Sequence, residues 1–357
     1  MNREDLVGKY EDYLLHQAAD LFNLDEGEIQ SFASYEGCRN LVYACRQYQD
    51  PVILRISYQQ DRTLDQIQAE IHFVNFLREN GVRAAKPLAS RTGLFVEQIL
   101  LDDLPIHIAC FEKGKGMRVP DNGYRYREGV PIDEYFQNWG RVLGQMHRLA
   151  KSYQPISPKV RRPDWYDLHA ARLDLDQMLP KALINLGDPI RFLLEKIRGL
   201  PKDNQGYGLI HGDFNDGNFT VDYSNSDITV FDFDDSCYFW FAYELASAWE
   251  GGIGRVMFSG LKERKAFMDH YMDQVLEGYA SENDLADEWL ARIPLFIKLI
   301  QLEEFLHYVQ YFDHRDDLEI QHHLNYLMVC IEQDLPYMGF FDPIFSPNAP
   351  FSLEIPR

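Results

Sequence analysis

Two short polar stretches contain the residues best suited to chemistry. The first, HGDFNDGN at residues 211–218, has the spacing His-x-Asp-x-x-x-x-Asn. In phosphoryl transfer, an Asp at this spacing accepts the proton of the attacking hydroxyl group, and the Asn holds Mg²⁺. We therefore predict that Asp213 is a catalytic base and that Asn218 is a magnesium ligand.

The second stretch, TVFDFDDS at residues 229–236, places Asp232 at the end of an apolar, strand-like run, fourteen residues after Asn218. Mg²⁺ takes few protein oxygens and completes its shell with phosphate oxygens and water, so one Asn and one Asp suit it. Asp232 is the second predicted magnesium ligand. Asp234 is either a further metal ligand or a solvated turn residue, and we favour the turn.

TVFDFDDS also fits the nucleophile motif of haloacid-dehalogenase-like phosphatases, in which the first Asp attacks phosphorus. Those enzymes need a Rossmann-like domain after the motif, with further polar residues at its strand ends. The part of this chain after Asp232 has no Gly-Asp pair and reads as helices rather than as alternating strands and helices. The metal-ligand interpretation is therefore favoured.

The elements expected before residue 113 are mostly strands. Short β-rich runs at 41–45 and 52–56 flank the turn signal QYQDP, which predicts a hairpin. Apolar residues at helical spacing predict one helix that ends at Asn80-Gly81, and further strands are expected at 94–100 and 106–111. The polar run KGKG then marks a predicted boundary between a lobe at 1–113 and a mainly helical lobe at 114–357.

A family resemblance follows from the order of three motifs. IHGDFNDGN, VFDFDDS and FAYELA resemble the motifs of the aminoglycoside phosphotransferase and choline kinase-like family, which includes homoserine kinase type II and stress-response kinase relatives. The resemblance implies an α+β, protein-kinase-like two-lobe fold, with a small β-rich N-terminal lobe and a larger, mainly helical C-terminal lobe. It also implies that ATP and Mg²⁺ are used to phosphorylate a hydroxyl group.

In this family, a cation on the third strand anchors the nucleotide and pairs with a helix glutamate. The matching positions are Arg55, in VILRI, and Glu70, in IQAEI. Protein kinases have Lys where this chain has Arg55. Arginine stays charged and binds phosphate with two parallel hydrogen bonds, but its reach differs from that of lysine. An ordinary ion pair between a strand and a helix is the alternative interpretation of these two residues.

Three further positions are assigned to the nucleotide site by the resemblance. SYEGCRN stands where a glycine-rich loop would cover the phosphates, and Gly37 is its only glycine. The segment 107–114 would be the hinge, where backbone groups near Phe111 and Glu112 would contact adenine.

Glu244, in FAYELA, takes the place of the family's Asp, and we expect its carboxylate to brace the catalytic loop.

Composition limits the partners. The 357-residue chain has 35 Lys and Arg against 56 Asp and Glu, a formal charge of -21. Such a surface disfavours nucleic acid and anionic lipid, and no apolar run reaches the roughly 18 residues of a membrane helix. Five scattered cysteines and the absence of a signal-peptide pattern favour a cytoplasmic location. The sequence carries no signal for an oligomeric state.

The acceptor is expected to be the hydroxyl group of a small molecule, such as an aminoglycoside, an amino alcohol or a homoserine-like compound. An acidic protein would suit a cationic acceptor. Four residues near the C-terminal helices are candidates for binding it: Glu303, Glu304, Tyr308 and Asp313. A protein serine or threonine acceptor, and a nucleotide-binding pseudokinase without transfer activity, are the alternatives.

Overall fold

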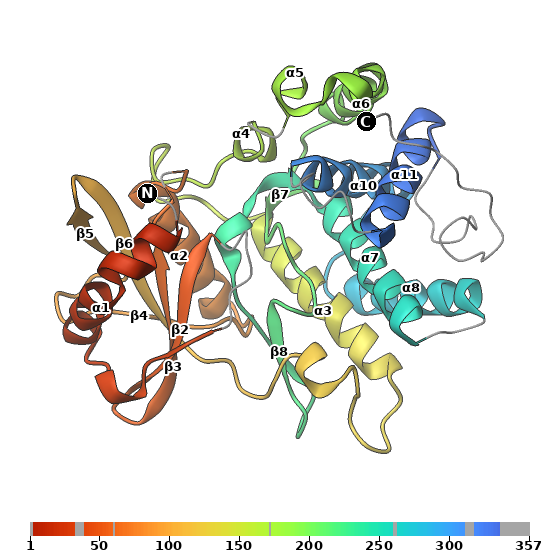
Figure 1. Cartoon of the computed structure of the whole chain (residues 1–357). Coiled ribbons are helices and arrows are strands. Elements are labelled where there is room, and N and C mark those ends of the chain that lie inside the picture. The colour runs from red at the N-terminus through yellow and green to blue at the C-terminus, as the bar shows by residue number, and fades with distance from the viewer. Residues whose placement is uncertain are drawn as a thin grey trace. The chain divides into compact units, whose positions relative to one another are not determined.

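The computed structural model describes residues 3–32, 39–59, 61–170, 173–259, 263–310 and 318–335 (Figure 1). Contacts divide the chain into two compact units, each built from several segments. The first unit contains Met1–Glu128, Ser152–Arg162 and Asp216–Ser236, and the second contains Gly129–Lys151, Pro163–Asn215 and Cys237–Arg357. The predicted boundary at 113/114 divides lobes rather than contact units, and it stays a prediction.

The first unit is built on a six-stranded antiparallel sheet of order β1-β2-β3-β6-β4, in which β5 also pairs with β6. Its strands are β1 (Gln30–Ser31), β2 (Asn40–Gln47), β3 (Asp50–Ser57), β4 (Pro87–Leu88), β5 (Glu97–Leu101) and β6 (Leu104–Glu112). The predicted hairpin is confirmed as β2–β3. Its turn residues Tyr48 and Gln49 have positive φ angles of 48° and 75°, which fits the tight two-residue connection.

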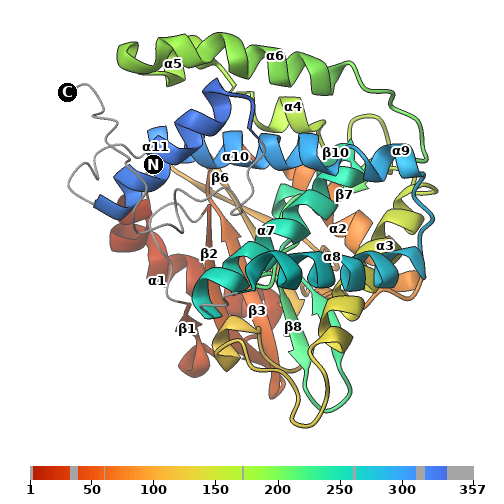
Figure 2. The same cartoon turned by 90° about the vertical axis from the view of Figure 1, so that its right-hand side faces the viewer.

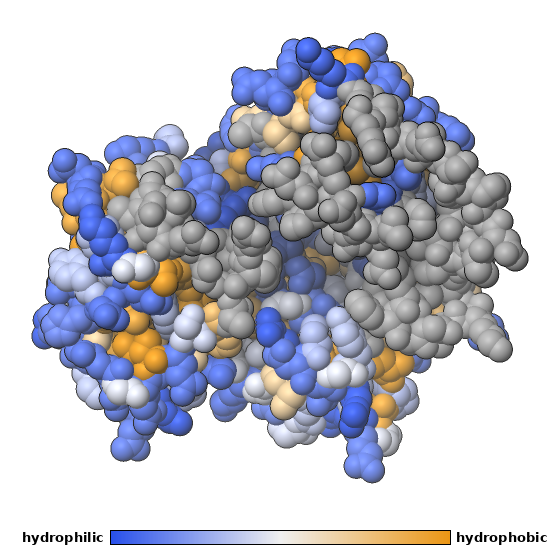
Figure 3. Space-filling view, in the orientation of Figure 1, coloured by the Kyte–Doolittle hydropathy of each residue, from blue (hydrophilic) through white to orange (hydrophobic). Residues whose placement is uncertain are grey.

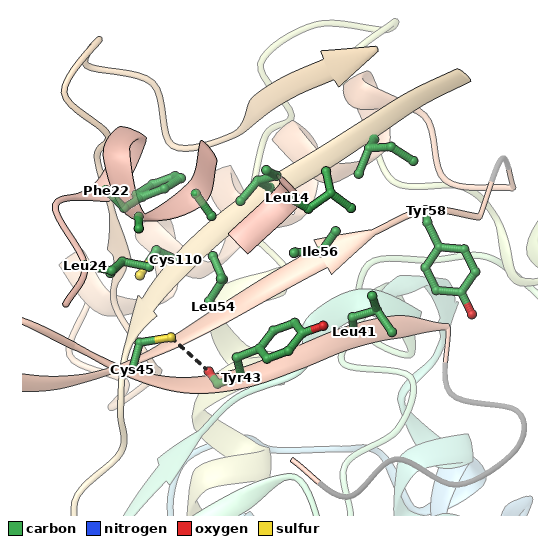
Figure 4. Close-up of a cluster of buried hydrophobic side chains, with 14 of the residues drawn as sticks. Leu14, Phe22, Leu24, Leu41, Tyr43, Cys45, Leu54, Ile56, Tyr58 and Cys110 are labelled. Carbon is green, nitrogen blue, oxygen red and sulfur yellow. Dashed lines mark hydrogen bonds between the residues drawn. The ribbon is translucent and has the colours of Figure 1, made fainter. Parts of the chain in front are cut away.

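Helix α1 (Arg3–Phe22) covers one face of this sheet. Its buried residues, which include Leu14 and Phe22, pack against the face that carries Leu54, Ile56 and Cys110 (Figure 4). The sequence analysis expected one helix before residue 113, so α1 corrects it. The apolar residues of α1 recur at intervals of about one turn among charged and polar neighbours, and they become a recognisable stripe only once the sheet face that buries them is known.

Helix α2 (Leu64–Glu79) lies on the opposite face and confirms the predicted helix. Thr63 caps its first turn, since the Thr63 side chain accepts from the backbone N–H of Gln66 while the Gln66 side chain accepts from that of Thr63. Such a reciprocal cap satisfies two backbone donors that would otherwise lack partners. Alternation along β3 then directs Arg55 toward α2, while Leu54 and Ile56 face α1.

The later segments of the first unit add a hairpin of β8 (Phe219–Asp222) and β9 (Asp227–Val230). Backbone hydrogen bonds from Ala85 to Val230 and from Val230 to Arg83, at 2.7 and 2.9 Å, attach this hairpin to the chain before β4. The strand-like run that was predicted to reach Asp232 ends earlier, at Val230, and a short 3-10 helix η4 (Phe233–Asp235) follows. Asp232 therefore lies in the turn between β9 and η4.

The second unit is mainly helical, as predicted. Its longer helices are α3 (Asp133–Ala150), α6 (Gly187–Arg198), α7 (Phe241–Ser259), α8 (Arg264–Ala280), α10 (Ile293–Gln310) and α11 (Leu318–Glu332). Strand β7 (Tyr207–Ile210) pairs with β10 (Cys237–Trp240), and the catalytic-loop motif begins directly after β7. Helices α3, α7 and α8 lie together in Figure 2.

The pairing of α3 with α8 depends on glycine. A Cβ atom at Gly140 would lie 1.9 Å from the carbonyl oxygen of Val275, and one at Gly278 would lie 2.0 Å from that of Gln137. Both distances are far below van der Waals contact, so no other residue fits at either position without moving the helices apart. These glycines let the two backbones approach closely enough for the side chains of α3 and α8 to form direct hydrogen bonds.

Hydrophilic residues prevail on the coloured surface in Figure 3, and the hydrophobic ones form small separate groups. Among the described residues, no helix is both long and apolar enough to cross a membrane. Cys45, Cys110, Cys237 and Cys330 are buried free thiols.

Candidate active site

The catalytic loop of the second unit is held by Glu244, in the first turn of α7. Its carboxylate accepts hydrogen bonds from the backbone N–H groups of Gly212, at 2.8 Å, and of His211, at 3.3 Å. Gly212 has a φ of 88°, which glycine adopts without the penalty that a side chain would bring. The contact expected between Glu244 and this loop is therefore present.

A buried histidine that the sequence analysis did not identify completes this brace. His147, on α3, lies 2.7 Å from a Glu244 oxygen through Nε2 and 2.9 Å from the Tyr279 hydroxyl through Nδ1. Burial favours the neutral imidazole and lowers the pKa of His147, although Glu244 opposes this shift. The signal that could have found it is a histidine placed among apolar residues on the buried face of a helix, in GQMHRL.

Asp213, the predicted base, is exposed at the end of this braced loop. One of its carboxylate oxygens accepts from the Asn215 side chain at 2.8 Å, and its backbone N–H lies 3.3 Å from Nδ1 of His211. The side chain is thus oriented by a neighbour while it stays accessible to an incoming hydroxyl group. A carboxylate in this situation fits a general base.

The two predicted magnesium ligands both lie in the first unit. The backbone N–H of Phe231 donates to the carbonyl of Asn218 at 3.0 Å, which ties Asn218 to the residue just before Asp232. Asp232 itself is exposed. The groups around the Asp232 carboxylate reduce its solvation, and this is the largest cause of its raised pKa. The negative charge of Asp234 is the second cause, and the pKa rises to about 7.

The residues at this turn fit a magnesium ion that shares its shell with phosphate and water. Among the described residues, no group of three or more His, Cys, Asp or Glu side chains could hold a metal unaided. Mg²⁺ needs no such group, because one or two protein oxygens are enough when a nucleotide supplies the others. Loss of solvation, and after it the negative charge of Asp234, raises the pKa of Asp232, and a bound cation would offset the repulsion between these two carboxylates.

Asp234 and Asp235 are tied to arginines of the first unit. Asp234 is 5% exposed, so it is not the solvated turn residue that we favoured. The buried Arg62 lies 2.9 Å from Asp235 and 3.5 Å from Asp234, Asn40 donates to Asp234 at 3.4 Å, and Arg39 pairs with Asp235. The carboxylates after Asp232 thus have structural partners, which motif reasoning alone did not reveal.

The predicted nucleotide-anchoring pair is in contact. Two nitrogens of Arg55 donate to the two oxygens of Glu70, each at 2.7 Å, and both side chains are buried. Burial by itself would lower the pKa of Arg55, but the charge and hydrogen bonds of Glu70 outweigh it and raise that pKa. The guanidinium also stands 5.2 Å from the ring centre of Phe111, within the range of a cation–π contact.

The remaining nucleotide-site predictions concern Phe111, Glu112 and Gly37. Phe111 and Glu112 end β6, where the backbone N–H of Glu112 donates to the carbonyl of Lys86 at 2.8 Å. An adenine contact in this segment would therefore use another backbone group. The Glu112 side chain is exposed and pairs with Lys86 at 3.0 Å. Gly37 lies outside the described residues.

Acidic groups gather near Asp213 within the second unit. The Tyr243 hydroxyl donates to Glu303 at 2.9 Å, and Glu304 lies 2.7 Å from His323. Loss of solvation, then the charges of Glu304, Glu303 and Asp213, raises the pKa of Glu250 to about 8. Glu250 was not predicted from the sequence.

A small open pocket adjoins this acidic group. Its lining combines apolar side chains with two carboxylates and one amide: Ala246, Trp249, Glu250, Ile297, Ile300, Gln301 and Glu304. Of the acceptor-site predictions, Glu304 lines the pocket, Glu303 lies one residue before it, and Tyr308 packs on His323 with ring centres 5.4 Å apart. Asp313 lies outside the described residues.

Comparisons with known proteins identify the family of this chain. A family model described as the phosphotransferase enzyme family matches residues 33–285. An amicoumacin kinase of Bacillus subtilis (strain 168) is 30% identical over 294 residues, which cover 81% of this chain and 82% of the relative.

Solved structures extend the comparison. An amicoumacin kinase in complex with AMP-PNP, Ca²⁺ and Ami is 28% identical with a TM-score of 0.84, covering 94% of this chain and 97% of that chain. A microcompartment-associated aminopropanol kinase has the same fold, with a TM-score of 0.69 at 21% identity, and the match covers 91% and 99% of the two chains. The predicted α+β, kinase-like fold is confirmed, and so is the resemblance from which it was predicted. The chain belongs to the phosphotransferase enzyme family.

Proposed function

We propose that this protein transfers the γ-phosphate of ATP to a hydroxyl group of a cationic small molecule, with Asp213 as the base. The observation that carries the proposal is an exposed Asp213 at the end of a loop whose backbone is held by Glu244. The relatives are kinases of small molecules, and one was solved with AMP-PNP and a divalent cation. ATP is accordingly the phosphate donor, and a divalent metal ion is its partner.

Five of the predicted residues have a role in this reaction. Asp213 accepts the proton of the attacking hydroxyl group and orients its oxygen. Asn218 and Asp232 would hold Mg²⁺, which when bound neutralises charge on the phosphate oxygens. Arg55 would contact the phosphates, and Glu70 holds its guanidinium in one orientation.

The acceptor class is inferred from the acidic group in the second unit. Loss of solvation, and after it the repulsion from neighbouring carboxylates, raises the pKa of Glu250 to about 8. A positively charged amine beside Glu250, Glu303 and Glu304 would relieve that repulsion and would favour their ionised forms. A neutral acceptor would leave the repulsion in place. A protein serine or threonine acceptor lacks this advantage unless a basic residue lies next to it.

The test of the base is Asp213→Asn, measured with radiolabelled ATP and an amine-bearing acceptor found by screening. We expect the turnover rate to fall by ~10²–10⁴-fold. Asp287→Asn, which changes an exposed Asp of the same unit, should leave the rate unchanged. Full turnover by Asp213→Asn would show that another group accepts the proton.

The test of the acceptor class compares Glu250→Gln and Glu304→Gln with the unchanged protein. Both variants should raise KM for amine-bearing acceptors and leave KM for ATP as it was. Acceptors matched in size but lacking the amine should respond much less. Equal responses for charged and neutral acceptors, or labelling of proteins with no small-molecule turnover, would contradict a cationic small-molecule substrate.

A further inference from the structure

We propose that a buried chain of hydrogen bonds, Asn283–Tyr279–His147–Glu244, fixes His147 in one neutral tautomer and thereby holds the catalytic loop. The four side chains are 3%, 2%, 0% and 1% exposed, respectively. All four are buried and act on the catalytic loop through one another, so they are positioning residues. The inference rests on the proposed role of Asp213, which directly follows His211 and Gly212, the two residues whose backbone N–H groups Glu244 accepts.

Proton counting assigns every donor in this chain. Glu244 accepts two backbone N–H groups, at 2.8 and 3.3 Å, so it acts as an ionised acceptor. The 2.7 Å contact with His147 therefore uses Nε2–H as the donor. A neutral imidazole with its proton on Nε2 has an acceptor at Nδ1, so the Tyr279 hydroxyl at 2.9 Å must donate to it.

The hydrogen bond between Asn283 and Tyr279 completes the assignment of protons. The Tyr279 oxygen, having donated its proton, accepts from the amide nitrogen of Asn283 at 2.6 Å. A protonated His147 would present N–H groups on both sides and would displace the Tyr279 proton from its only place in the chain. Burial opposes that charged form as well. One arrangement of protons thus satisfies all four residues.

The chain is anchored on three helices of the second unit. His147 is on α3, Tyr279 is on α8 with Asn283 just beyond its end, and Glu244 is in the first turn of α7. The Phe241 ring stacks on the His147 ring with centres 4.4 Å apart, which limits rotation of the imidazole. Side chains held in this way position a site more accurately than a loop does by itself.

The consequence for catalysis concerns the placement of Asp213. If His147 releases Glu244, the carboxylate can turn away from Gly212 and the loop can shift. A displacement of about 1 Å at a reacting group can cost about 10²-fold in rate. Binding of ATP uses residues of the first unit, so KM for ATP should not change when these hydrogen bonds are removed.

The test uses two pairs of variants, assayed for kcat and for KM of ATP. His147→Leu removes both hydrogen bonds and should lower kcat by about 10²-fold with KM for ATP unchanged. His147→Gln keeps one N–H donor and one acceptor, and it should restore most of kcat. Tyr279→Phe removes one hydroxyl group and should lower kcat less. The matched control is Tyr271→Phe on the same helix, α8, which removes a buried hydroxyl that donates to the backbone carbonyl of Ala248 on α7; it should leave kcat unchanged.

A spectroscopic readout separates this proposal from the role of Asp213. Nitrogen NMR of the histidine ring should show a protonated Nε2 and an unprotonated Nδ1 in the unchanged protein, and a mixture of forms in Tyr279→Phe. A doubly protonated ring, a His147→Gln variant as impaired as His147→Leu, or equal losses in Tyr279→Phe and Tyr271→Phe would overturn the proposal. Should His147→Leu fail to fold, the two tyrosine variants and the NMR readout decide it. The tautomer is observable whether or not Asp213 proves to be the base.

Discussion

Replacing Glu70 with leucine is expected to lower the free energy of unfolding by about 3 kcal/mol. The change leaves the Arg55 guanidinium, 5% exposed, without the two 2.7 Å hydrogen bonds and the charge of Glu70. Breaking a buried ion pair from one side typically costs about 3–5 kcal/mol, because the remaining charge is uncompensated. Asp232 and Asp234 lie close enough to stabilise the positive charge in part, so we expect the lower end of this range.

The double variant Arg55→Met/Glu70→Leu separates stability from function. Apolar replacement of a whole buried pair is often neutral or stabilising, so the double variant should be more stable than Glu70→Leu alone. Both variants should bind Mg-ATP poorly, because the phosphate-binding cation is either misplaced or absent.

The measurement is urea unfolding followed by circular dichroism, with Mg-ATP affinity from calorimetry. Glu79→Leu, an exposed change on the same helix, is the matched control and should shift stability by less than ~0.5 kcal/mol. Our account of the pair would be refuted by a Glu70→Leu variant as stable as the control. It would equally be refuted by a double variant less stable than the single one, or by either variant binding Mg-ATP normally.

Two further predictions concern the turn that carries Asp232 and the close packing of α3 against α8. The pKa of Asp232 is raised from 3.8 to about 7, so the folded state holds the proton more tightly; without metal, the stability it contributes should be lost as pH rises from about 4 to 7. Thermal melting of Asp232→Asn should lack this loss and any gain from Mg²⁺, while Mg²⁺ binding by the unchanged protein should weaken below pH 7; a melting curve of Asp232→Asn with the same pH and Mg²⁺ dependence would contradict this. Gly140→Ala should lower stability in urea by about 1–3 kcal/mol, because its Cβ would lie 1.9 Å from the Val275 carbonyl. Gly8→Ala, where nothing lies within 4 Å in α1, should instead raise it by up to ~1 kcal/mol, and similar effects at the two glycines would contradict the crossing geometry.

The features that the sequence predicted well are those with a local signal. Two β-rich runs around the turn signal QYQDP predicted the β2–β3 hairpin, and apolar residues at helical spacing predicted α2. The pairing of Arg55 with Glu70 was expected from the family resemblance, which matched one residue to each of these two elements. The contact between Glu244 and the catalytic loop was likewise expected from the resemblance.

The features that it did not predict depend on residues far apart in the chain. Arg62 meets Asp235 across 173 positions, and Arg39 does so across 196. An isolated arginine carries no local sign of its partner. His147 has the same difficulty, because its partners Tyr279 and Glu244 lie 132 and 97 positions away. Long-range polar partners are determined by how the helices and loops pack, which spacing within one segment does not report.

These long-range partners change the interpretation of TVFDFDDS. Asp232 has a left-handed backbone, with φ of 64° and ψ of 60°, and for a residue other than glycine such a conformation costs about 1–3 kcal/mol. The buried Arg162 opposes relaxation, since it donates to the backbone carbonyl of Ser236 at 2.7 Å and to that of Asp234. Arg62 binds the Asp235 side chain of the same turn. The three acidic residues therefore divide their work: Asp234 and Asp235 tie the turn to arginines, and this leaves the strained and exposed Asp232 as the carboxylate available to a metal ion.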